Sequence, residues 1–231
     1  MKKFLALVIA LSFSTLVSAH VDKGVKTKLQ FAPDSEYLAS RVDTGRLTFV
    51  PEDISFPAGS QKKKFEEALK IVEEVLNSQE FKTKVIGYQR VKGDRSFQKN
   101  YLWNDSKKLL SNEDIYEIIM TGDEKMRPGT KGEMNINSWV KICSGFQSLG
   151  TWCRAVIGST TPHTSKWITY NWKFYSYFST PDMVANMVHE WIHLLGFLHG
   201  SVNMDKEVPY VVGEIAGEVA KELLIKKSLL N

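Results

Sequence analysis

Residues 180–200 read TPDMVANMVHEWIHLLGFLHG, and this stretch decides the fold that the chain is expected to have. Three of the five histidines of the 231-residue chain fall inside it. Its start is typical of a helix, because Thr180 can act as the N-cap, Pro181 suits the first helical position and Asp182 complements the helix dipole. The pattern predicts a helix from Pro181 to about Leu195.

The first two histidines of this stretch, His189 and His193, stand four residues apart. On a helix, this spacing places them about 40° apart around the axis and about 6 Å apart along it, so both imidazoles can bind one metal ion. Glu190 lies beside His189 around the helix. A carboxylate there can accept a proton from a metal-activated water without binding the metal itself. The spacing predicts two metal ligands, His189 and His193, and one catalytic base, Glu190.

The third histidine, His199, cannot join the other two if the helix continues, because the ten residues after His189 carry it about 15 Å along the axis. A zinc–nitrogen bond is only about 2 Å long. The helix therefore has to end, and Gly196 can adopt a left-handed backbone conformation at little cost. We predict a turn at Gly196 and a loop that brings His199 to a single Zn2+ ion.

The residues H-E-W-I-H-L-L-G-F-L-H at 189–199 resemble the extended zinc signature of the metzincin metallopeptidases, H-E-x-x-H-x-x-G-x-x-H. The resemblance implies an α+β fold with a twisted mixed β-sheet, an active-site helix that ends at Gly196, and a smaller lower part with a C-terminal helix. It also implies a metalloendopeptidase that hydrolyses peptide bonds, with Glu190 as general base. A protein or peptide substrate would bind extended beside a sheet edge, sought first at Thr160 to Tyr175.

Two residues after the motif are candidates for further roles that the resemblance implies. Metzincins carry a methionine beneath the metal, and Met204 is the sole methionine after the motif. Some metzincins also use a tyrosine that binds zinc or stabilises the transition state, and Tyr210 is the nearest one. The alternatives are a loop or core methionine and a core aromatic residue that packs against the last helix.

Two other functions stay open at this stage. A gluzincin-like peptidase would take its third ligand from a glutamate on a following helix, and Glu214 and Glu218 are four residues apart there. A catalytically silent zinc-binding or adhesion module would keep the metal for stability alone. Glu190 disfavours such a module, because structural zinc sites need no base and usually fill all four positions with protein ligands.

The N-terminus has the layout of a secretory signal peptide at residues 1–19, with a basic start, an apolar run and small residues before His20. The apolar run is shorter than the roughly 20 residues that span a bilayer. We expect cleavage after Ala19 and a secreted or periplasmic protein. Residues 20–44 are expected to form an irregular arm or short pro-segment, and residues 45–231 a single catalytic domain.

The composition, 43% hydrophobic and 24% charged, is that of an ordinary globular protein. Loss of Lys2 and Lys3 with the signal lowers the formal net charge from +4 to +2. The low charge gives no reason to expect a nucleic-acid partner. No later segment is long and apolar enough to cross a bilayer, so we expect no stable membrane insertion. The protein is expected to be a monomer. The only cysteines, Cys143 and Cys153, are expected to form a disulfide after export, with free thiols or metal ligation as the alternatives.

Elsewhere the pattern predicts an amphipathic helix after Ser60 and a second helix capped by Ser111. The predicted buried face of the first helix consists of Phe65, Ala68, Leu69, Val72, Val75 and Leu76. Strands are predicted at 45–50, 85–91, 134–142, 151–157 and 166–175, and a last helix from about Val208 to Leu224.

Overall fold

The computed structural model describes residues 30–31, 47–50, 54–55, 61–89, 110–127, 131–143, 149–161, 165–199 and 207–230. Within these ranges the chain contains seven helices and a small mixed sheet, which confirms the predicted α+β class. The predicted signal peptide, the predicted arm apart from residues 30–31, and Met204 lie outside the described residues.

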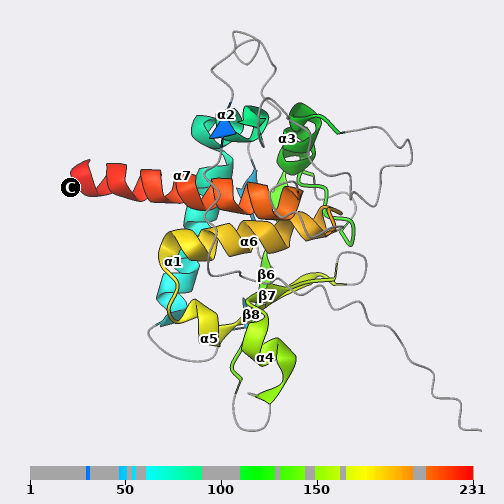
Figure 1. Ribbon diagram of the computed structural model, residues 1–231, viewed down its shortest axis with the longest axis vertical. Coiled ribbons are helices and arrows are strands. Elements are labelled where there is room, and N and C mark those ends of the chain that lie inside the picture. The colour runs from blue at the N-terminus through cyan, green and yellow to red at the C-terminus, as the bar shows by residue number, and fades with distance from the viewer. Residues whose placement is uncertain are drawn as a thin grey trace, which may run out of the picture.

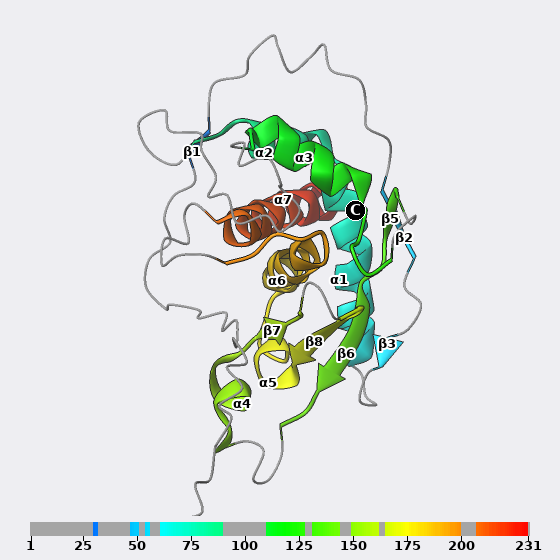
Figure 2. The same cartoon turned by 90° about the vertical axis from the view of Figure 1, so that its right-hand side faces the viewer.

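Two long helices, α6 (Thr180–Leu194) and α7 (Val208–Leu230), lie side by side at the centre of the molecule (Figure 1). Figure 2 shows this pair between two other layers. Helices α2 (Gln79–Ile86) and α3 (Asn112–Thr121) lie beyond α7, and the sheet lies beyond α6. Helix α1 (Gln61–Leu76) packs against both central helices. Helix α6, which carries the motif, is therefore held between α7 and the sheet.

Among the described residues, the main sheet has four strands in the order β3-β6-β8-β7. Strands β3 (Ile54–Ser55), β6 (Asn137–Lys141) and β8 (Trp167–Asn171) run parallel, and β7 (Gly158–Ser159) pairs antiparallel with β8. Strand β7 is an edge of this sheet and contacts α6. The sheet therefore presents its one antiparallel strand to the motif helix.

Two further strand pairs lie apart from this sheet. Strand β1 (Gln30–Phe31) pairs antiparallel with β4 (Tyr88–Gln89). Strand β2 (Thr48–Phe49) pairs parallel with β5 (Glu133–Met134). Each pair is only two residues long. The two pairs join segments that lie between helices, and they do not extend the main sheet.

The hydrophobic core extends from the sheet past helices α1, α6 and α7 to helices α2 and α3. All six residues predicted to form the buried face of α1 are part of it. Three core aromatic rings join α1 to the sheet: the ring of Tyr170 lies 5.3 Å from that of Phe65 and 4.9 Å from that of Tyr175. This packing fixes the sheet against the helices and so places β7 beside α6.

Two predicted strands are partly helical. Residues 151–155 form helix α4 (Thr151–Ala155), which follows Gly150 and carries Cys153. The expected disulfide between Cys143 and Cys153 is present, and it ties this short helix to the end of β6. The strand predicted at 85–91 is wrong at its start, because α2 continues to Ile86; within the part of this segment that the structure describes, Tyr88–Gln89 are extended.

The aromatic segment at 166–175 is a strand only in its first half. Strand β8 ends at Asn171, and Trp172–Tyr175 form helix α5. The Asn171 side chain accepts a hydrogen bond from the backbone N–H of Lys173, at 3.1 Å, and its amide donates to the carbonyl of Val156, at 2.9 Å. A side-chain cap of this kind favours the start of a helix over continued β pairing.

The starts of the predicted helices agree with the structure, with one shift at α6. Ser111 caps α3 as expected. In α6 the cap is Ser179, not Thr180: the Ser179 Oγ accepts from the backbone N–H of Asp182, and the Asp182 carboxylate accepts from the backbone N–H of Ser179. Helix α7 is six residues longer than predicted and ends at Leu230. In the described part of the chain, no helix combines the length and apolar character that crossing a bilayer requires.

Candidate metal centre

Helix α6 ends where the sequence predicts. Its last helical residue is Leu194, and Gly196 has a φ of 108°, a backbone conformation that favours glycine. The backbone N–H of Gly196 donates to the carbonyl of His193, and that of Phe197 donates to Ile192. These bonds satisfy carbonyl groups at the helix end and turn the chain toward His199.

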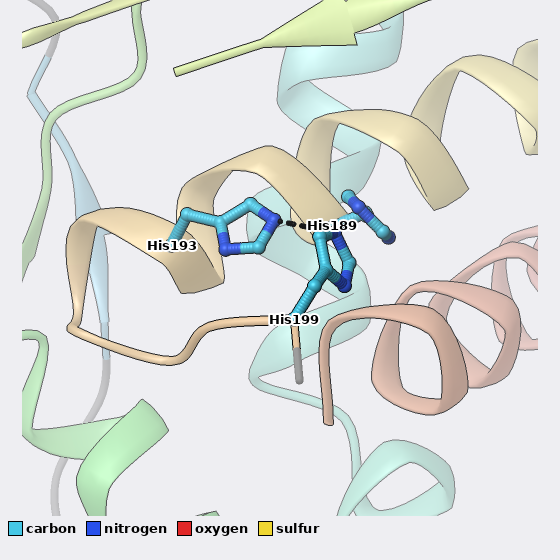
Figure 3. A group of neighbouring side chains, drawn as sticks. All are labelled: His189, His193 and His199. Carbon is cyan, nitrogen blue, oxygen red and sulfur yellow. Dashed lines mark hydrogen bonds between the residues drawn. The ribbon is translucent and has the colours of Figure 1, made fainter. Parts of the chain in front are cut away.

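The three predicted ligands meet at one point. His189 and His193 project from α6 and His199 from the loop after it, with the three rings turned toward one another (Figure 3). One ring nitrogen from each histidine can be chosen so that the three atoms all lie within 4.8 Å of one another. The Nε2 atoms of His193 and His199 are 3.1 Å apart. Nitrogen ligands of a tetrahedral zinc ion are roughly 3.3 Å apart, which is close to the separation of this pair.

The other ring nitrogen of each histidine faces away from this point and makes a hydrogen bond to another part of the protein. His193 Nδ1 donates to the carbonyl of Phe197 at 2.6 Å, and His199 Nδ1 donates to a carboxylate oxygen of Glu207 at 2.6 Å. His189 makes a hydrogen bond with the backbone of Pro209, whose only backbone hydrogen-bonding group is its carbonyl. All three Nδ1 atoms then carry the hydrogen, and all three Nε2 atoms present a lone pair.

These three lone pairs make the site suited to a metal ion. His189 Nε2 is buried and has no hydrogen-bond partner among the described residues. Two nitrogen lone pairs that face each other at 3.1 Å repel unless a proton or cation lies between them. Neutral imidazoles whose other nitrogen is hydrogen-bonded are preferred ligands of zinc. The donor set therefore fits a borderline-soft divalent cation such as Zn2+.

Burial keeps two of the histidines neutral. It is the largest cause that lowers the pKa of His193 to about 3, and the neighbouring His199 adds to it. Burial likewise lowers the pKa of His189 well below its usual value, with further contributions from His193 and His199. A metal ion and a proton compete for the same lone pair, so a low pKa leaves these two nitrogens free for the metal.

Glu190 lies on the sheet side of α6, and its carboxyl group is buried. Burial raises the pKa of Glu190 to about 8, and a side-chain hydrogen bond from Asn186, one helical turn earlier, opposes that rise. The Tyr175 hydroxyl donates to Asn186 Oδ1 at 2.7 Å. Strand β7 covers this group closely: a Cβ atom on Gly158 would lie 2.7 Å from Asn186 Oδ1 and 3.0 Å from Glu190 Oε1. Glu190 is thus held between Asn186 and an edge strand.

The first two turns of helix α7 lie next to the three histidines. The ring of Tyr210 lies 4.7 Å from the ring of His189 and 4.7 Å from that of His199. Burial raises the pKa of Tyr210 to about 12, with further contributions from Glu207 and Glu190, so the hydroxyl stays protonated at neutral pH. Sequence reasoning left open whether Tyr210 is near the site, and the structure places it there.

The contact between α6 and α7 depends on glycine. A Cβ atom on Gly213 would lie 2.7 Å from the carbonyl oxygen of Ala185 and 3.1 Å from His189 Cβ. One turn later, a Cβ atom on Gly217 would lie 2.9 Å from Ala185 Cβ and 3.2 Å from the carbonyl oxygen of Pro181. The pair lets the helices approach closely, so that the start of α7 reaches the histidines.

The alternative glutamate ligands are not part of this group. The Glu218 carboxylate pairs with Lys84 Nζ at 3.2 Å, and Glu214 is exposed on α7. The residues that sequence reasoning missed are Asn186, Glu207 and Pro209. Glu207 could have been found from the sequence, because it is a carboxylate directly before an apolar helix and only eight residues after His199.

Comparisons with known proteins give no relative: no protein-family profile, no curated protein and no solved structure matches this chain.

Proposed function

We propose that the chain is an exported zinc-dependent endopeptidase of metzincin type. The observation that carries the proposal is the meeting of three histidine Nε2 lone pairs at one point, delivered by a helix, a glycine turn and a loop. The position of Glu190 directly after the first ligand, buried beside an edge strand, supports a catalytic site over a purely structural one. The disulfide supports export, because such bonds persist in oxidising compartments.

The arrangement around α6 supports the metzincin assignment. The motif helix lies under a mixed sheet, ends at a glycine turn and is followed by a C-terminal helix, in the order that the resemblance implies. Zinc bound by three neutral histidines would lower the pKa of a water molecule toward 7, polarise a peptide carbonyl and favour the ionised form of Glu190.

Glu190 would move the protons of the reaction. As a carboxylate it accepts a proton from the attacking water, and as a carboxylic acid it returns that proton to the leaving amine nitrogen. The hydrogen bond from Asn186 holds the carboxyl group in place for both steps. Tyr210 keeps its hydroxyl proton at neutral pH, so it can donate a hydrogen bond to the oxygen that becomes negative in the transition state.

The substrate would bind as an extended peptide, but not along the strand first expected. Strand β8, within the segment from Thr160 to Tyr175, pairs with neighbours on both sides, so it has no free edge. Strand β7 forms the edge, and Gly158 in it lies against Glu190. A peptide added beside β7 would gain main-chain hydrogen bonds and lie next to the proposed base.

The test compares wild type with Glu190→Ala, each produced as the chain that begins at His20. The measurements are zinc content after dialysis and cleavage of an unfolded protein such as casein, with and without a chelator. We expect one zinc ion in both proteins, cleavage by wild type that the chelator abolishes, and a loss of about 10²- to 10⁴-fold in the variant. A variant that holds zinc and still cleaves at the wild-type rate would exclude the role of Glu190. Wild type with zinc but no cleavage would instead favour a silent zinc-binding module.

A further inference from the structure

The carboxylate of Glu207 is the only side chain among the described residues that bonds the outer nitrogen of a proposed ligand. Its oxygen accepts from His199 Nδ1 at 2.6 Å, and only 1% of the side chain is exposed. His193 and His189 use backbone carbonyls for the same purpose. The third ligand is therefore held by a charged group, and the other two are held by neutral ones.

This difference follows the place of each histidine in the chain. His189 and His193 are fixed by a regular helix, whereas His199 is on a loop and has no helical hydrogen bonds to hold its backbone. A loop residue keeps more conformational freedom, and ordering it for metal binding costs free energy. A hydrogen bond to a buried carboxylate, at 2.6 Å, lowers that cost because the ring is already oriented.

The burial of Glu207 itself requires an explanation, because a buried carboxylate without partners is strongly destabilising. Glu207 directly precedes α7, and its carbonyl accepts from the backbone N–H of Val211. The carboxylate is thus at the N-terminus of a long helix, where the helix dipole favours negative charge. Helix α7 stabilises the charge at the position where His199 needs a partner.

The charge also matters to the occupied site. Three neutral imidazoles around a divalent cation leave two positive charges in a buried place, and nearby carboxylates reduce the cost of burying them. Glu207 and Glu190 are both buried, and both carboxylates raise the pKa of Tyr210, whose ring lies beside the proposed ligands. A hydrogen-bonded carboxylate also makes the histidine ring a better electron donor to the metal.

We propose that Glu207 is a positioning residue: it orients His199 and thereby sets the affinity of the three-histidine site for its metal. The inference rests on the metal site of the proposed function, and it is independent of the peptidase reaction.

The experiment measures zinc affinity by competition with a chromophoric chelator for wild type and for the variants Glu207→Ala and Glu207→Gln. Glutamine keeps an oxygen that can accept from His199 and loses the charge, so it is the conservative variant. The matched control is Glu222→Gln, which removes an exposed carboxylate from the same helix, where it pairs with Lys84. We expect a loss of about 10- to 100-fold in affinity for Glu207→Ala, a smaller loss for Glu207→Gln and no change for the control.

A cobalt titration separates positioning from a general effect on stability. The visible absorption of Co2+ depends on ligand geometry, so it should change in both Glu207 variants and not in Glu222→Gln. Unchanged zinc affinity and an unchanged cobalt spectrum in Glu207→Gln would overturn the proposal, and this variant decides the question if Glu207→Ala does not fold. Wild type without zinc affinity would overturn the proposed function together with this inference. If the zinc affinities follow the expected order but wild type cleaves no protein, the result would refute the proposed peptidase activity and leave the role of Glu207 intact.

Discussion

Strand β7 and the first turns of α7 approach helix α6 from different sides, and they contact different residues of the motif (Figure 2). On the sheet side, Gly158 of β7 lies against Glu190 and against Asn186, which bonds Glu190. On the α7 side, Pro209 and Tyr210 contact His189, and Glu207 bonds His199.

The difference suggests that the two sides of α6 govern different properties. Changes on the β7 side displace the proposed base and leave the ligands in place, so they should lower turnover at constant zinc affinity. Changes on the α7 side displace ligands, so they should lower zinc affinity first. Substitutions confined to one side can test this separation.

The largest effect is expected from Gly158→Ala. The added Cβ would lie 2.7 Å from Asn186 Oδ1 and 3.0 Å from Glu190 Oε1, so both side chains must shift. A displacement of about 1 Å in a catalytic group can lower turnover about 100-fold. We expect a fall of that order in kcat with one zinc ion still bound, measured by casein cleavage and zinc content.

The control for this variant is Ser159→Ala on the same strand. The Ser159 hydroxyl accepts a hydrogen bond from Trp152 Nε1, and the change removes it without adding an atom near Glu190. Its kcat should remain within about twofold of wild type, because the loss of one neutral, partly exposed hydrogen bond has a small effect. A parallel loss of zinc affinity in Gly158→Ala would show that β7 also shapes the ligands.

The sequence was sufficient to predict that the three histidines come together, because the geometry of α6 and of the turn after it is local. His189 and His193 are one helical turn apart, and the rise of the helix alone requires that the chain turn back before His199. Gly196 was assigned to that turn because few residues adopt a positive φ cheaply, and its φ of 108° confirms the assignment. The burial pattern of α1 was predictable for the same reason, since helical periodicity is a local property.

The hydrogen-bond partners of these histidines could not be predicted from local patterns. Glu207 and Pro209 reach the histidines only because α7 packs closely on α6, and this contact depends on the glycines at 213 and 217. The strand predicted at 151–157 was wrong for a similar reason. β-branched and aromatic residues favour strands only where a neighbouring strand pairs with them, and here a disulfide ties a short helix to the chain instead.

A smaller effect is expected from Gly213→Ala on the other side of α6. The new Cβ would lie 2.7 Å from the carbonyl oxygen of Ala185 and 3.1 Å from His189 Cβ, so the helices must separate or His189 must move. Overpacking of this kind costs about 1–3 kcal/mol of stability. We expect zinc affinity to fall about tenfold, as for the loss of a ligand's supporting contact, measured by chelator competition.

Gly217→Ala is the matched control for that variant. It adds the same methyl group one turn further along α7, where the nearest atoms belong to Ala185 and Pro181 and not to a ligand. Its free energy of unfolding should fall by a similar 1–3 kcal/mol, and its zinc affinity should remain near that of wild type. Equal losses of affinity in the two variants would mean that helix separation, and not displacement of His189, controls the site.

The smallest effect on the metal centre is expected from Trp191→Phe, although this residue is within the motif. The Trp191 indole donates to a carboxyl oxygen of buried Glu124 at 2.8 Å, and the backbone N–H of Asn135 donates to the same oxygen at 2.7 Å. Loss of a hydrogen bond to a buried carboxyl costs about 1–3 kcal/mol of unfolding free energy. Because this bond reaches neither α7 nor β7, zinc affinity and kcat should stay within about twofold of wild type.

Denaturant unfolding of Trp191→Phe with a chelator present would measure the loss of stability separately from metal binding. Trp152→Phe is the matched control, because its indole donates only to the half-buried Ser159 hydroxyl, at 3.2 Å. That variant should lose less than about 1 kcal/mol, since a neutral, partly exposed hydrogen bond contributes little. A fall in zinc affinity for Trp191→Phe would show that the position of α6 as a whole sets the site. The separation between the β7 side and the α7 side would then no longer account for metal binding.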